Sequence, residues 1–97
     1  MVKNSSDILS VLKANKALLQ EKYPISELGI FGSYARGEQQ PDSDIDVLVD
    51  FNGEIGLKFI KLAHDLEDLL DAKIDLVHKK AIKPKYWQYI QKNLIYV

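Results

Sequence analysis

Hydrophobic positions in the first quarter of the chain follow the spacing of a helix. Within residues 5–22 the apolar side chains that recur every three or four residues are Ile8, Val11, Leu12, Leu18 and Leu19. Ser5 or Ser6 is a suitable N-cap for this helix, and Pro24 is expected to end it. The pattern therefore predicts an amphipathic first helix.

Three short apolar runs then predict strands at residues 26–32, 45–51 and 73–77, with the turn pair Asn52-Gly53 after the second. An apolar stripe in residues 56–70 predicts a long helix between the second and third strands. Pro84 fits the first turn of a last helix, in which the residues that share a face are Trp87, Ile90 and Leu94. A strand, a helix and a strand in succession require the two strands to be parallel. We expect an α+β fold, a short mixed β-sheet flanked by helices.

The composition narrows the class of protein. The chain has 97 residues, of which 46% are hydrophobic and 28% charged, so we expect one folded domain spanning residues 1–97. The absence of cysteine excludes disulfides, thiolate nucleophiles, redox chemistry and cysteine-based zinc sites. No stretch has the pattern of a signal peptide or a membrane span, so we expect a cytoplasmic location without membrane binding.

Charge is distributed unevenly although the net charge is only −1. Residues 38–54 contain six acids and no Lys or Arg, whereas residues 78–97 contain five lysines and no acid. Tyrosines and a tryptophan are interleaved with these lysines. The first segment is suited to a cation, and the second to an acidic partner. The aromatic residues of the second segment are explained equally well by a helix that packs on the sheet.

Three acids are expected to converge at the start of two strands. Asp46 and Asp75 each follow an isoleucine at the entry to an apolar run, so they stand at similar heights on parallel neighbours, and Asp44 joins Asp46 on one face. Two carboxylates about 5 Å apart repel by roughly 3 kcal/mol at an effective dielectric constant near 20. Oxygen ligands without cysteine favour Mg²⁺, or Mn²⁺, over zinc. These acids therefore predict a divalent metal site, although Asp75 alone could instead pair with Lys73.

The Gly32-Ser33 step predicts a phosphate site. If a short helix begins at Ser33, its free backbone N–H groups face outward, and Gly32 allows close approach of a phosphate. The Ser33 hydroxyl can add one hydrogen bond, while Arg36 can either contact phosphate or pair with Glu38. The acidic run is not an EF-hand, because Val47 stands where that loop needs its turn glycine.

The segment GSYARGEQQPDSDIDVLV, in which ten residues separate Ser33 from Asp44, resembles the signature of minimal nucleotidyltransferase (MNT) domains of the DNA polymerase beta-like superfamily. The similarity extends through KIDLV, where Asp75 falls at the position of the third carboxylate of that family. This resemblance implies that Gly32 and Ser33 bind a triphosphate. It also implies that three acids hold two Mg²⁺ ions, namely Asp44, Asp46 and Asp75, with Asp75 as the general base.

The resemblance further implies ATP or another NTP as substrate and a HEPN-type protein as partner. Many such pairs act as toxin and antitoxin, in which the MNT protein transfers AMP from ATP to a tyrosine of the HEPN ribonuclease. Two alternatives stay open: a non-catalytic module that neutralises its partner by contact alone, and transfer to a small molecule as in aminoglycoside-modifying relatives. The missing substrate lobe argues against the second. Direct nucleic-acid binding is not expected, because no RNA motif accompanies the lysines.

Overall fold

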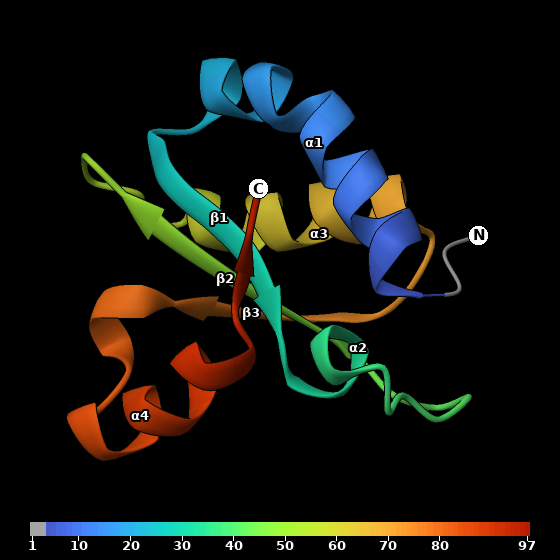
Figure 1. Cartoon of the computed structure of the whole chain (residues 1–97). Coiled ribbons are helices and arrows are strands. Elements are labelled where there is room, and N and C mark those ends of the chain that lie inside the picture. The colour runs from blue at the N-terminus through green and yellow to red at the C-terminus, as the bar shows by residue number, and fades with distance from the viewer. Residues whose placement is uncertain (1–3) are drawn as a thin grey trace.

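The computed structural model describes residues 4–97 and arranges them in three layers (Figure 1). The first three residues of the predicted domain 1–97 lie outside the described residues. Two helices, α1 and α3, cover one face of a four-stranded sheet, and α4 lies on the other face. In chain order the elements are α1 (Ser5–Lys22), β1 (Ile25–Phe31), α2 (Gly32–Arg36), β2 (Ile45–Phe51), α3 (Lys58–Leu70), β3 (Ile74–His78), the 3₁₀ turn η1 (Lys79–Ala81), α4 (Pro84–Asn93) and β4 (Ile95–Tyr96). The predicted α+β class is confirmed.

The strand order is β3-β2-β1-β4. β2 and β3 are parallel, whereas β1 pairs with both β2 and β4 in the antiparallel sense. The predicted mixed sheet and the parallel pair joined through α3 are therefore both confirmed. In the register of this parallel pair, Asp46 stands opposite Asp75.

The hydrophobic core lies between the sheet and helices α1 and α3. Leu12 of α1 and Leu66 of α3 are fully buried against the buried side chains at every second position of β2, which are Ile45, Val47, Val49 and Phe51. Burial of each such side chain stabilises the fold by roughly 1.5–3 kcal/mol. Because strand side chains alternate, Asp46, Leu48 and Asp50 point to the opposite face, the one that carries α4.

The N-cap of α1 differs from the prediction. Asn4, not Ser5 or Ser6, is the cap: its backbone is extended, and its side-chain oxygen accepts a hydrogen bond from the backbone N–H of Asp7 at 3.0 Å. Asparagine and serine are both good N-caps, so the run Asn-Ser-Ser offers several suitable residues. The helix begins after the earliest of them, which places both serines in its first turn.

The end of the chain also differs from the prediction. The last helix stops at Asn93, and Leu94 has extended backbone angles instead of continuing the apolar face of α4. Ile95 and Tyr96 then pair with Ile30 and Gly29 of β1 as a two-residue strand. A Cβ at Gly29 would lie 2.7 Å from the carbonyl oxygen of Ile95, so the close pairing requires glycine there.

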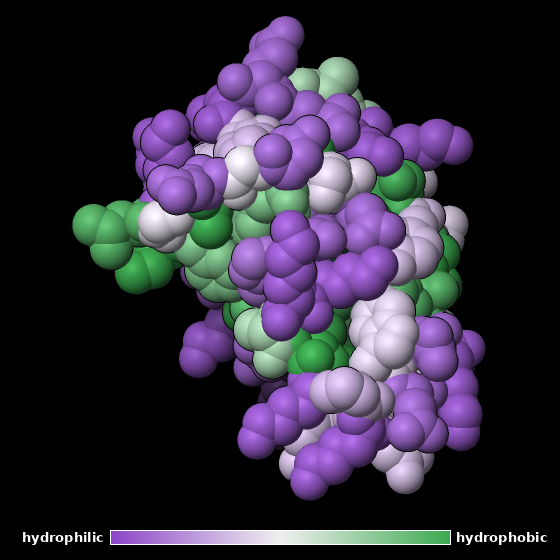
Figure 2. Space-filling view, turned by 90° about the vertical axis from the view of Figure 1, so that its left-hand side faces the viewer, coloured by the Kyte–Doolittle hydropathy of each residue, from purple (hydrophilic) through white to green (hydrophobic). Residues whose placement is uncertain are grey.

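The surface shows mainly hydrophilic groups with smaller apolar areas between them on the face drawn in Figure 2. Among the large hydrophobic side chains of residues 4–97, Leu57, which precedes α3, has the highest exposed fraction, 87%. Over the same residues, none of the helices combines the length and the apolar character that a bilayer crossing needs.

Candidate active site

The corner between β1 and α2 is built around Gly32. Its φ of +74° lies in the left-handed region that glycine adopts without strain. A Cβ at this position would also overlap the carboxylate of Asp46, which stands opposite Phe31 in the register of β1 and β2. The glycine of the predicted phosphate site therefore lies directly against a predicted metal ligand.

The three predicted acids interact at this corner. Asp46 and Asp75 are register partners on parallel strands, and Asp44 lies two residues before Asp46, just outside β2. The pKa of Asp46 is raised from its ordinary 3.8 to about 6, mostly by burial and further by the negative charges of Asp75 and Asp44, while Arg36 acts to lower it. The structure thus brings the three acids into one electrostatic group, in which Asp46 is half-buried and the other two are exposed.

This group suits a cation by its charge and its chemistry. Carboxylate oxygens are the ligands that Mg²⁺ prefers, and the negative charges of Asp75 and Asp44 add to burial in raising the pKa of Asp46, although Arg36 acts to lower it. Within residues 4–97, however, no three His, Asp or Glu side chains are arranged so that they could hold a metal ion as they stand. The oxygen donors are of the kind that Mg²⁺ prefers, but the metal-binding roles of the three residues stay predictions.

Ser33 and Arg36 flank the same corner on α2. Ser33 is half-buried in the first turn, where its carbonyl oxygen accepts the backbone N–H groups of Gly37 and Glu38. The Arg36 Nε donates to Glu38 at 3.2 Å, which is the alternative that the sequence left open for this side chain. The side chains of Arg36 and Glu38 are partly or largely exposed, so their ion pair is weak. Arg36 can therefore leave Glu38 for a more highly charged anion.

A hollow that the sequence did not predict adjoins Gly32 and Arg36. It has a volume of about 220 Å³ and lies between α2 and the last two turns of α4. Its wall on α4 consists of Tyr89, Ile90 and Asn93. The sequence indicated only that the aromatic residues of segment 78–97 meet a partner or pack on the sheet, because no local pattern shows that the end of α4 returns to β1.

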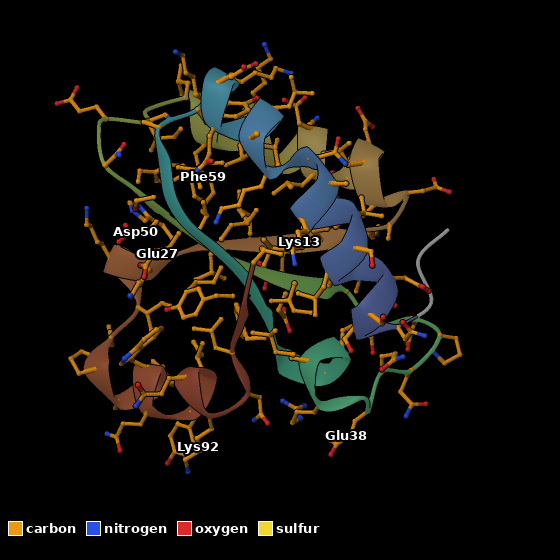
Figure 3. All side chains as sticks on the ribbon, turned by 45° about the horizontal axis from the view of Figure 1, so that its top comes forward. Lys13, Glu27, Glu38, Asp50, Phe59 and Lys92 are labelled. Atoms are coloured by element: carbon orange, nitrogen blue, oxygen red, sulfur yellow. The ribbon has the colours of Figure 1, made fainter. Side chains whose placement is uncertain are left out.

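Other polar groups and hollows lie away from this corner. Figure 3 shows Asp50 and Glu27 together at the far end of β1 and β2, while Glu38 lies beside α2. Although burial acts to raise the pKa of Asp50, hydrogen bonds from the backbone of Phe51 and from His78, with the charge of Lys80, hold it below its usual value. This network stabilises the end of the sheet. His78 belongs to the network and therefore lies away from the corner at Gly32.

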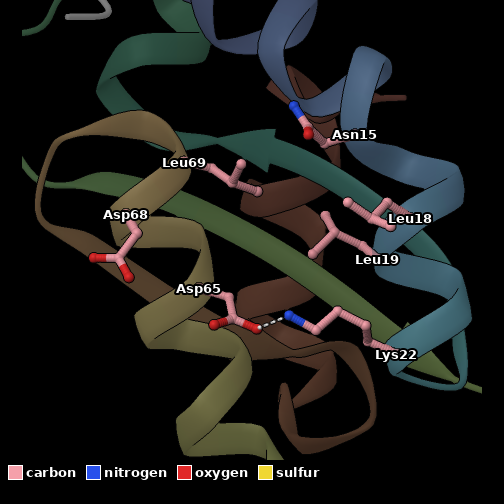
Figure 4. Close-up of a pocket in the computed structure, with 7 residues that line it drawn as sticks. All are labelled: Asn15, Leu18, Leu19, Lys22, Asp65, Asp68 and Leu69. Carbon is pink, nitrogen blue, oxygen red and sulfur yellow. Dashed lines mark hydrogen bonds and ion pairs between the residues drawn. The ribbon is translucent and has the colours of Figure 1, made fainter.

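A second hollow separates α1 from α3 on the other face of the sheet (Figure 4). The residues that line it are Asn15, Leu18, Leu19, Lys22, Asp65, Asp68 and Leu69. Lys22 and Asp65 form an ion pair of 3.2 Å across it. It contains none of the predicted site residues, so the corner at Gly32 is the candidate active site.

Comparison with known proteins supports this assignment. The family model described as nucleotidyltransferase domain matches residues 12–97. Protein adenylyltransferase MntA of Thermococcus cleftensis is 45% identical over 93 residues, which covers 94% of this chain and 93% of that protein.

Solved structures share the fold. A structure of a proposed minimal nucleotidyltransferase superposes with a TM-score of 0.72 at 30% identity, covering 91% of this chain and 93% of that one. A crystal structure of a toxin–antitoxin with AMP-PNP gives a TM-score of 0.68 at 25% identity, covering 97% of this chain and 72% of that one. With its family model, its relatives and its fold in agreement, the chain belongs to the nucleotidyltransferase domain family and is an enzyme of the minimal type.

Proposed function

We propose that the protein transfers AMP from ATP to a tyrosine hydroxyl of a HEPN-type partner and thereby acts as an antitoxin. The observation that carries the proposal is the contact between Gly32 and the Asp46 carboxylate, with Asp75 in register beside it. The similarity to a protein adenylyltransferase supports AMP as the transferred group. The similarity to a toxin–antitoxin structure with AMP-PNP supports ATP as donor and an antitoxin role.

Each residue of the corner has a distinct part in this reaction. Gly32 lets the backbone of the corner lie directly against the Asp46 carboxylate, the Ser33 hydroxyl donates a hydrogen bond to the triphosphate, and Arg36 exchanges Glu38 for a phosphate oxygen. Asp75, which is exposed, accepts the proton of the tyrosine hydroxyl. The tyrosine oxygen then bonds to the α-phosphorus, the bond from that phosphorus to the bridging oxygen breaks, and pyrophosphate leaves.

Asp44, Asp46 and Asp75 would hold Mg²⁺ in this proposal. When bound, Mg²⁺ supplies positive charge that activates the acceptor hydroxyl and stabilises the leaving pyrophosphate. Mn²⁺ fits the same oxygen ligands. The repulsion of the Asp46 carboxylate by Asp75 and Asp44, which adds to burial in raising the pKa of Asp46, is the feature of this chain that supports a requirement for a cation.

The experiment combines the purified protein with Mg-ATP and a HEPN-type protein as the acceptor. Mass spectrometry of the partner should show the addition of AMP at tyrosine. Asp44→Asn and Asp46→Asn should abolish the transfer, while Asp68→Asn on the exposed face of α3 should leave it unchanged. Circular dichroism should show that all three variants stay folded.

Two results would contradict the proposal. If Asp44→Asn and Asp46→Asn neutralise the partner as well as the unmodified protein does, neutralisation occurs by contact alone. If AMP is transferred instead to a free aminoglycoside or sugar in the absence of any partner protein, the acceptor is a small molecule.

A further inference from the structure

The hollow between α2 and α4 is continuous with the predicted phosphate site. Its lining residues are Phe31, Gly32, Arg36, Tyr89, Ile90 and Asn93, so it shares Gly32 and Arg36 with that site. We propose that this hollow receives the purine base of ATP, with Tyr89 stacking on the base and Asn93 bonding to its edge. This inference rests on the proposed function, because it takes a nucleoside triphosphate as the substrate.

The size and lining of the hollow favour a base over phosphate. Its volume of about 220 Å³ is smaller than the roughly 300–1,000 Å³ that accommodates a whole drug-sized ligand, so it suits one part of a nucleotide. An aromatic ring, an aliphatic side chain and a neutral amide form its wall on α4, and Arg36 is its charged residue. Phosphate would favour charged donors throughout, whereas a flat heterocycle favours this mixture.

Tyr89 is placed as a stacking platform. Its side chain is 69% exposed although it stands beside the half-buried Ile90, so burial in the core does not account for its position. The Lys92 Nζ lies 5.4 Å from the centre of the Tyr89 ring, and Figure 3 shows Lys92 on α4 at the same side of the molecule as Glu38 after α2. Bases stack on such exposed aromatic rings in nucleotide-binding surfaces.

Asn93 gives the hollow a means to select adenine. Its side-chain amide has both donors and an acceptor. Adenine presents a donor and an acceptor side by side at its amino group and N7, whereas guanine presents two acceptors at the corresponding edge. An asparagine can therefore form a paired contact with adenine that it cannot form with guanine.

A second aromatic group on α4 does not meet these conditions. Trp87 lines a hollow with Lys79 and Lys80, but there Lys79 donates to Glu27 at 2.8 Å and Lys80 pairs with Asp50 at 3.6 Å. Those cations are already neutralised, and their partners lie at the end of the sheet away from α2 (Figure 3). Of these two hollows, only the one at Tyr89 adjoins Gly32.

The test measures the binding of Mg-ATP and of inorganic tripolyphosphate to the full chain by calorimetry. Tyr89→Ala should weaken ATP binding by roughly 5- to 150-fold, the range for loss of one stacked base, and leave tripolyphosphate binding within about twofold. Tyr89→Phe should restore ATP binding, because the ring is retained. Tyr86→Ala is the matched control: Tyr86 is on the same helix, 54% exposed, with Lys85 Nζ 5.1 Å from its ring, but it does not line the hollow.

Asn93→Ala should lower the preference for ATP over GTP by about fivefold or more without changing tripolyphosphate binding. Equal melting temperatures of the variants would show that the fold is intact. The inference is overturned if Tyr89→Ala leaves ATP binding unchanged, if it weakens both probes equally, or if Tyr86→Ala has the same effect. If the unmodified chain binds neither probe, the proposed function itself fails, and the base site fails with it.

Discussion

Replacement of Asp46 by asparagine should stabilise the protein at neutral pH in the absence of metal. The pKa of the Asp46 carboxyl rises from its ordinary 3.8 to about 6 in the folded state, because burial and the neighbouring Asp75 and Asp44 disfavour its charge. Each pKa unit corresponds to ~1.36 kcal/mol, so a rise of roughly two sets a ceiling near 3 kcal/mol. Solvent contact and salt screening reduce this, and we expect a gain of about 1–2 kcal/mol in the free energy of unfolding at pH 7.5.

The pH dependence identifies the cause of this gain. The folded state holds the proton of Asp46 more tightly than the unfolded state does, so the unmodified protein loses stability as the pH rises from about 4 through about 6. Asp46→Asn does not titrate there, and the two proteins should be equally stable below pH 4. For a domain of this size 1 kcal/mol corresponds to about 4–8 °C in melting temperature, so the expected difference is easily measured.

The assay is urea unfolding and thermal melting in EDTA at several values of pH. Asp42→Asn, an exposed acid in the loop before β2, is the control and should change little. Addition of Mg²⁺ at pH 7.5 should raise the melting temperature of the unmodified protein more than that of Asp46→Asn. A variant less stable than the unmodified protein at pH 7.5, or a difference that does not vary with pH, would refute the electrostatic reasoning.

Three further predictions concern the corner and the core. Gly32→Ala should lower the free energy of unfolding by about 1–3 kcal/mol and weaken ATP binding, because φ is +74° and the new methyl group overlaps Asp46. Urea unfolding measures the first effect and calorimetry the second, and an unchanged free energy of unfolding would contradict the prediction. Tyr23→Phe removes the hydroxyl that donates to Asp65 and holds the pKa of that carboxyl below its usual value. We expect the free energy of unfolding to fall by about 1–2 kcal/mol at pH 7, and the difference to fade as the pH falls and Asp65 protonates. An equal difference at every pH would exclude this cause. Leu66→Ala empties a fully buried position and should cost about 2–5 kcal/mol by urea unfolding, and a loss below 1 kcal/mol would show that the core closes around the gap.

Much of the fold could be predicted because its elements have strong local patterns. Apolar stripes predicted helices α1 and α3, and an apolar run predicted strand β2. The strand–helix–strand order then predicted that β2 and β3 are parallel. This pairing in turn predicted Asp46 beside Asp75, as the register of β2 and β3 shows. The N-cap was mispredicted because adjacent residues have similar capping ability, and only the backbone at Asn4 decides between them.

The parts that could not be predicted depend on contacts distant in the sequence. Ile95 and Tyr96 are too few to show a strand pattern, and their pairing depends on Gly29, more than sixty residues earlier, which tolerates the close approach. The same pairing fixes where Tyr89 and Asn93 lie, so the hollow beside Gly32 could not be found from local spacing. The sequence predicted which acids and which glycine meet at this corner, but not which residues surround it.

The two-residue strand β4 acts as a latch for the helix that precedes it. Only Leu94 separates Asn93 from Ile95. The strand is held by its pairing with β1, by a 2.9 Å hydrogen bond from the backbone N–H of Val97 to the Leu28 carbonyl, and by a 2.7 Å hydrogen bond from Lys16 Nζ to the Val97 carbonyl. So few bonds can open far more often than the whole domain unfolds. Each opening of β4 would release the end of α4, which carries Tyr89 and Asn93. The amide exchange rates of residues 95–97 should therefore report how often this side of the hollow opens.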